Sequence, residues 1–125
     1  MLAGVLREHA PAAFEEFVTR YGKVLDLAIE QSNYQVDNHL TEALQNLADE
    51  MGVHGVGPRD VLDVHNAALR QMRQGQRPRK AQSYLEEGRL LARELMGHLV
   101  SFYRRYAIGN RLRGAGTRRR EEHDA

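Results

Sequence analysis

Apolar residues recur at spacings of three and four along most of this chain, which is the pattern of one face of an α-helix. Prolines and glycines divide the pattern into four helical segments, expected at about 11–31, 32–52, 58–75 and 79–108. Ser32 or Asn33 would cap the second segment. No stretch alternates apolar and β-branched residues with polar ones as a strand does, so the sequence predicts an all-α fold.

Each segment presents one apolar face, and together these faces form the predicted core. Their members are Phe14, Phe17, Tyr21, Val24, Leu25 and Ala28, then Val36, Leu40, Ala43, Leu44, Leu47 and Met51, then Val61, Leu62, His65, Ala68, Leu69 and Met72, then Tyr84, Leu85, Gly88, Leu91, Leu95, His98, Leu99, Phe102 and Tyr106. The last segment would be about 45 Å long, which exceeds the length that a bundle of this mass needs. Its far end is expected to project or to pack on a second chain.

We therefore predict a four-helix bundle with a long C-terminal helix over residues 11–108, assembled as a homodimer. Residues 1–10 would form an N-terminal arm. Residues 109–125 are predicted to be a flexible, arginine-rich tail, because they lack the apolar spacing of a packed helix.

The charge is distributed unevenly over the 125 residues. Residues 104–125 hold seven arginines against three acidic residues, and residues 1–103 hold 11 basic against 14 acidic residues. A domain that holds nucleic acid is usually basic over its folded surface, so nucleic acid is not an expected partner. Binding of nucleic acid by Arg118–Arg120 remains an alternative to a simply solvated tail.

Membrane and secretory features are not expected either. No apolar run approaches the roughly 20 residues that span a bilayer, and the first residues are too short for a signal-peptide core. The chain holds no cysteine, and we predict a cytoplasmic protein without a membrane partner.

Catalytic motifs are sparse, and we expect no enzyme, cofactor or metal. A carboxylate-bridged metal site in a helical bundle needs Glu-x-x-His pairs on two helices. Glu94 and His98 stand four residues apart, but a second matching pair is missing. A metal-binding bundle enzyme built on these two residues is kept as an alternative. The glycine cluster at 52–57 follows a helix and lacks an adjacent lysine, unlike a phosphate-binding loop.

Two groups of residues are candidates for protein binding. His65 and His98 lie on apolar faces, where a histidine either packs through a hydrogen bond or serves a pH-sensitive or partner-contacting role. Residues 102–106 combine aromatic side chains with Arg104 and Arg105. They form either a helix terminus with cations at its negative dipole end or a protein-binding edge, since tyrosine and arginine are enriched in interface hot spots.

Three stretches resemble a family of bacterial regulators. Pro58-Arg-Asp-Val-Leu-Asp-Val-His65-Asn-Ala-Ala-Leu69 resembles the third helix of the domain shared by the N-terminal part of the stress-response phosphatase RsbU and the C-terminal part of the clock protein KaiA. Gly97-His98-Leu-Val-Ser-Phe-Tyr103-Arg104-Arg105 resembles the closing motif of the KaiA-type last helix, and the segment from Arg20 to Leu25 resembles the first helix of both. The similarity covers roughly residues 14–108.

The resemblance implies a homodimeric four-helix bundle that binds a regulatory kinase or switch protein in a groove at or near the dimer interface. In the RsbU-like branch docking activates a phosphatase in stress-response partner switching; in the KaiA-like alternative it stimulates a clock-type kinase. This chain holds neither a phosphatase nor a receiver-like domain, and its 52–57 turn is longer than the family's. The residues expected at the groove or dimer interface are His65, Leu69, His98, Phe102, Tyr103, Arg104 and Arg105.

Overall fold

The computed structural model describes residues 6–35 and 37–124, with side chains as far as Ala107. These residues form five helices and no strand, which confirms the all-α prediction. The helices are α1 (Leu6–His9), α2 (Pro11–Tyr34), α3 (Leu40–Val53), α4 (Pro58–Arg73) and α5 (Pro78–Asp124). The first five residues of the predicted arm lie outside the described residues. The remainder of the arm includes α1, whose Leu6 is buried in the core.

The connection between α2 and α3 differs from the prediction. Ser32 and Asn33 lie within the last turns of α2 instead of capping the next helix. Gln35 ends α2 in the left-handed conformation and its backbone N–H binds the carbonyl of Gln31, a common way to satisfy a helix C-terminus. The Asn38 side chain donates a hydrogen bond to the Leu27 carbonyl, which ties the loop back onto α2. Val36, a predicted core residue, lies outside the described residues.

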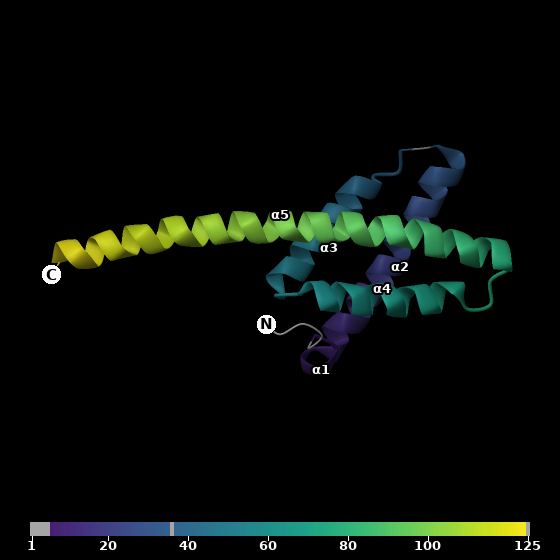
Figure 1. Cartoon of the computed structure of the whole chain (residues 1–125), viewed down its shortest axis with the longest axis horizontal. Helices are drawn as coiled ribbons and strands as arrows, with labels where there is room; N and C mark the ends of the chain where they lie inside the picture. The colour runs from purple at the N-terminus through teal and green to yellow at the C-terminus, as the bar shows by residue number, and fades with distance from the viewer. Residues whose placement is uncertain (1–5, 36, 125) are drawn as a thin grey trace.

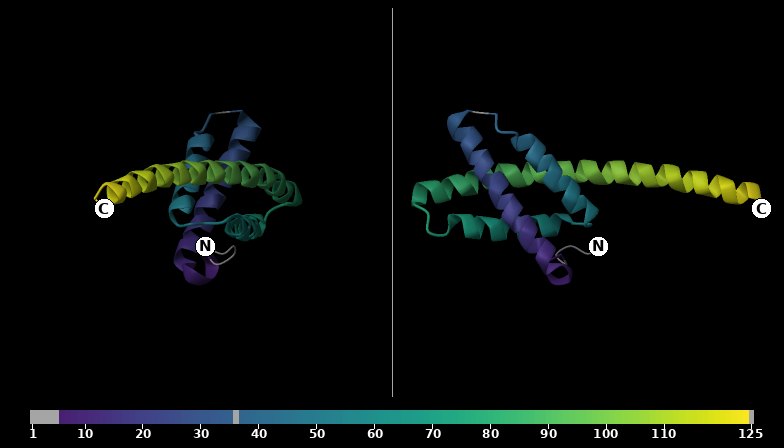
Figure 2. Two further views of the ribbon diagram at one scale, coloured as in Figure 1. Left: turned by 60° about the vertical axis from the view of Figure 1, so that its left-hand side comes forward. Right: turned by 180° about the vertical axis from the view of Figure 1, so that it is seen from behind.

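The C-terminal helix is also longer than predicted, because α5 continues to Asp124 instead of ending near residue 108. No proline occurs after Pro78, and arginine, alanine and leucine are good helix formers, so the helix continues although Gly109, Gly114 and Gly116 lower its local propensity. The segment predicted as a flexible tail thus has a helical backbone. Figures 1 and 2 show it extending away from the other helices.

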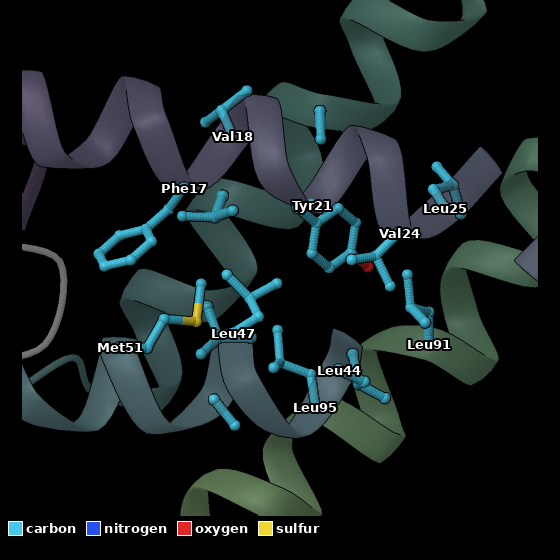
Figure 3. Close-up of a cluster of buried hydrophobic side chains, with 14 of the residues drawn as sticks. Phe17, Val18, Tyr21, Val24, Leu25, Leu44, Leu47, Met51, Leu91 and Leu95 are labelled. Atoms are coloured by element: carbon cyan, nitrogen blue, oxygen red, sulfur yellow. The ribbon is translucent and has the colours of Figure 1, made fainter. Parts of the chain in front are cut away.

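The four long helices enclose one core. A short connection joins α4 to α5, and the two run side by side in opposite directions, while α2 and α3 cross them (Figure 1). α5 contacts all three of the other long helices. The centre of the core lies where α2, α3 and α5 meet, as Figure 3 shows, and is filled by Tyr21, Leu25, Leu44, Leu47 and Leu95.

Two predicted core positions are exposed. Leu62 is 43% exposed because the buried face of α4 is centred on Val61, Val64, Ala68 and the residues beside them. Tyr106 is 56% exposed because it lies beyond Tyr103, the last residue of α5 that packs against the core among the described side chains. The other predicted core residues that the structure describes are buried or partly buried.

Candidate functional site

The predicted site residues fall into two separate groups along α5. His65 and Leu69, on α4, pack against Gly88 in the middle of the bundle. His98 and residues 102–105 follow ten or more positions later on α5, where His98, Phe102, Tyr103 and Arg105 line cavities together with residues of α3. The structure therefore does not bring all seven residues together within one chain.

His65 is a buried, hydrogen-bonded residue of the core. Its Nδ1 lies 2.6 Å from the Tyr21 hydroxyl, which is also 3.3 Å from the Gly88 carbonyl oxygen. The hydroxyl has one proton, and the shorter distance favours donation to an unprotonated Nδ1. Burial lowers the pKa of His65 and raises that of Tyr21, so both groups are held neutral.

Leu69 has a similar packing role beside His65. A Cβ added to Gly88 would lie 3.1 Å from Leu69 Cδ2 and 3.2 Å from His65 Cε1, so α4 and α5 approach closely at this glycine. Both side chains are buried within the chain. Neither contributes to an open surface.

The second group forms an exposed apolar surface, which we call the exit surface and define by Val53, Phe102 and Tyr106. Val53 is 76% and Tyr106 56% exposed. The Phe102 and Tyr106 rings stack with centroids 6.4 Å apart and planes at 8°. The exit surface lines a cavity of about 410 Å³ together with Gly52, Gly55 and Tyr103.

Contacts beneath the exit surface hold its aromatic rings in place. The Phe102 ring lies directly on the backbone of α3, where a Cβ at Gly52 would overlap it. The Tyr103 hydroxyl donates a 2.7 Å hydrogen bond to the carbonyl of Val56, a fully buried residue of the turn after α3. Burial, and next the negative charge of Asp60, raise the pKa of Tyr103, so this phenol remains a donor.

The Asp60 carboxylate stabilises that turn through two hydrogen bonds. One of its carboxylate oxygens accepts a hydrogen bond from the Gly57 N–H at the start of α4, and the other accepts one from the Leu6 N–H of α1, each at 3.1 Å. A carboxylate at this position caps the helix N-terminus. The turn that anchors Tyr103 is therefore joined to two helices.

A polar edge borders the exit surface. Arg105 and Asp49 form an ion pair of 3.5 Å whose side chains are 70% and 53% exposed. They line a small cavity of about 220 Å³ with His98, Gln45 and Ser101, so His98 belongs to this polar edge. Among the residues whose side chains are described, no three histidine, aspartate or glutamate side chains come close enough to hold a metal ion, so nothing here supports the Glu94–His98 metal site.

Sequence reasoning identified one side of the exit surface and missed the other. Phe102, Tyr103 and Arg105 stood out as a cluster of aromatic residues and arginines, whereas Gly52 and Val53 looked like parts of a turn. The sequence did offer one indication of this residue: Val53 is a large apolar residue that lies off the buried face of its helix and next to a glycine. Only the fold shows that it meets residues about fifty positions later.

Comparison of the chain with protein-family models, with curated proteins and with solved structures finds no match. Over the part of the chain that the structure describes, no helix is long and apolar enough to cross a membrane.

Proposed function

We propose that this chain is a non-catalytic, homodimeric protein-binding module that regulates a kinase or phosphatase in partner-switching signalling of the RsbU type. KaiA-like stimulation of a clock-type kinase is the alternative output. The exit surface is the proposed contact site between two copies. We also propose that the protein is cytoplasmic and catalyses no reaction.

The observation that carries the proposal is the exposure of Val53 and Tyr106 beside a firmly held aromatic ring. Apolar side chains grouped in this way are typical of surfaces that another protein covers. Tyrosine and arginine are the residue types enriched in binding hot spots, and Arg105 lies at the edge of this surface. The Phe102 ring, already packed on α3 at Gly52, would lose little conformational entropy on binding.

A second copy of the chain is the occupant that the charges favour. The edge of the exit surface carries both a base, Arg105, and an acid, Asp49, in exposed positions. In a two-fold dimer the same patch meets itself, so a patch that carries both signs is complementary to its own copy. A surface of one sign would repel its copy instead.

The sequence resemblance also favours this region as the binding site, and it is the basis for the proposed regulation of a kinase or phosphatase. The stretch from Gly97 to Arg105 resembles the closing motif of the family's last helix, and it contributes Phe102 to the exit surface and Arg105 to its edge. A regulatory kinase or switch protein would then bind near the dimer interface, with Arg104 as an exposed contact residue.

The dimer is tested by sedimentation equilibrium of the purified full chain at micromolar concentrations. The expected mass is twice 14.3 kDa. Tyr106→Asp should give monomers that keep the helical signal of the wild type, with a melting temperature lower only by the stabilisation that dimer formation adds. Leu90→Asp is the matched control, because Leu90 is equally exposed on α5 but remote from the exit surface, and it should leave the dimer intact. A wild-type chain of monomer mass contradicts the proposal.

Regulation is tested separately with a purified switch-type kinase from the same cells. Wild-type chain should change the rate of phosphate transfer, and Arg104→Glu should reduce that effect while the dimer mass and the helical signal stay unchanged. A dimeric protein that changes no kinase or phosphatase rate would contradict the regulatory output but not the dimer.

A further inference from the structure

A second cleft lies at the opposite end of the packed part of α5. It has a volume of about 460 Å³ and separates the last turns of α2 from the first turns of α5. Ile29 and Tyr34 line it from α2, and Arg79 and Lys80 line it from α5, with Arg77 just before that helix. None of these residues belongs to the exit surface.

The cationic side of this cleft holds three charges with no acidic partner. Among the ion pairs formed by the described side chains, none includes Arg77, Arg79 or Lys80. The Lys80 side chain lines the cleft, and its ammonium lies over the Tyr84 ring, 5.8 Å from the ring centroid. Three cations at one small cleft form a site for a negatively charged group.

Two carboxylates also line the cleft, and they differ in what they contact. Asp26 accepts a 2.7 Å hydrogen bond from the Tyr84 hydroxyl, so one of its oxygens is already occupied. Glu30 is exposed and has no hydrogen bond or ion pair among the described residues. Three cations against two carboxylates leave a net charge of +1 on the lining. Glu30 is thus the group that opposes binding of an anion.

The α2 side of the cleft carries two apolar side chains, Ile29 and Tyr34, among the polar Asp26, Glu30 and Asn33. Ile29 is almost fully buried and forms a fixed wall, whereas the Tyr34 ring is 73% exposed at the rim. Ligand sites of this volume combine apolar walls with a few charged groups that fix the orientation of the ligand. A free inorganic ion would use only the cations and would leave this wall unused.

We propose that the cleft binds a small organic anion that carries an apolar body and a phosphate or carboxylate group. The apolar body would lie against Ile29 and Tyr34, and the anionic group would be bound by Arg77, Arg79 and Lys80. This site is independent of the exit surface and does not require the dimer.

The test is a titration of the full chain with phenyl phosphate and, separately, with phenylacetate, followed by amide chemical shifts in NMR spectra. We expect saturable shifts concentrated at Ile29, Tyr34 and Arg79. The probe that binds more tightly shows whether the cleft prefers a phosphate or a carboxylate group. Inorganic phosphate should bind at least about tenfold more weakly, because it lacks the apolar body.

Variants with opposite effects separate specific binding from a change in folding. Lys80→Glu should weaken binding of the better probe by about tenfold or more, while Glu30→Gln should tighten it severalfold. Arg59→Glu is the control, because Arg59 is an exposed arginine at the start of α4 outside the cleft lining, and it should change nothing. Melting temperatures of all the variants verify that they fold.

Three results would each overturn the proposal. The first is the absence of saturable shifts at millimolar concentrations of either probe. The second is binding of inorganic phosphate as tight as that of the aromatic probes, and the third is binding that survives Lys80→Glu unchanged.

Discussion

The two parts of α5 share one continuous backbone and have different surroundings. Up to Tyr103, the helix buries a regular set of residues against α2, α3 and α4, among them Leu91, Leu95 and Leu99. From residue 104 onward, seven arginines and three acidic residues replace that pattern, and the helix extends away from the bundle (Figure 2). Tertiary packing supports the first part, whereas the second depends on local helix propensity, which Gly109, Gly114 and Gly116 weaken.

A segment can therefore adopt a helical conformation without the stability that packing gives to a helix. An isolated helix of moderate length is only marginally stable in water, and most helices in proteins depend on the burial of an apolar face. The packed part of α5 should therefore resist unfolding with the whole domain. The projecting part should open on its own with a small free-energy cost.

The largest expected effect comes from removing a core side chain of the packed part. Leu95→Ala should lower the free energy of unfolding by about 2–5 kcal/mol, because Leu95 is fully buried and its truncation leaves a cavity. Val100→Ala is the matched control on the same helix. Val100 is 49% exposed, so its truncation should cost less than about 1 kcal/mol. Urea unfolding measures both, and equal losses would contradict the packing described for α5.

A smaller effect is expected where α5 crosses α3 and leaves the bundle. Gly52→Ala should destabilise the fold by about 1–3 kcal/mol, because the new methyl group would overlap the Phe102 ring. In the double variant with Phe102→Ala, most of that added cost should disappear, since the overlap is gone. A double-mutant cycle measures this coupling. Strictly additive effects would show that Gly52 and Phe102 do not meet.

The packed part should also contribute a pH dependence through His65. Burial lowers the pKa of His65 in the folded chain below its ordinary value of 6.5, so protonation favours the unfolded state. The stability that neutral His65 contributes is present above pH 6.5 and is lost as the pH falls below that value. In His65→Asn, which can still bond to Tyr21 without titrating, the loss between pH 7 and pH 5 should be smaller. Identical pH profiles of the two melting temperatures would refute this role.

The smallest effect is expected from the projecting part. Deletion of residues 109–125 should change the free energy of unfolding by less than about 0.5 kcal/mol, because the backbone of this part of α5 extends away from the other helices in Figure 1. Hydrogen exchange of the full chain gives a direct comparison. Amides in the deleted segment should exchange far faster than those near Leu91 and Leu95. Slow exchange in both parts would indicate that something covers the projecting helix.

The helical periodicity predicted the fold well where a residue's surroundings depend on its own helix. The apolar faces of α2 and α3 and the buried spacing of α5 followed from the repeat of three and four residues. The start of α3 was predicted at the wrong residue for a different reason. Ser32 is a good cap by residue type, but the left-handed conformation of Gln35 and the hydrogen bond of the Asn38 side chain determine where the chain turns. The predicted end of α5 near Ile108 was wrong: it was placed where the glycines from Gly109 onward begin and the apolar spacing stops, whereas the helix continues to Asp124.

For the same reason, only half of the candidate site could be predicted from the sequence. Aromatic residues beside arginines marked Phe102 and Arg105, since these neighbours lie on one helix. Val53 and Gly52 joined them only through the crossing of α3 and α5. His65 and Leu69 shared a family-like motif with the site, but the close approach of α4 and α5 at Gly88 covers both.

Photo-cross-linking at the exit surface tests the central claim most directly, namely that this surface is the contact between two copies. A photoreactive phenylalanine analogue would replace Tyr106 in one purified preparation and Tyr34, an even more exposed tyrosine at the other end of the bundle, in another. The account predicts a covalent dimer at position 106, with cross-links to α3 or α5 of the other copy, and almost none at position 34. No dimer at position 106, or equal yields at the two positions, would contradict it.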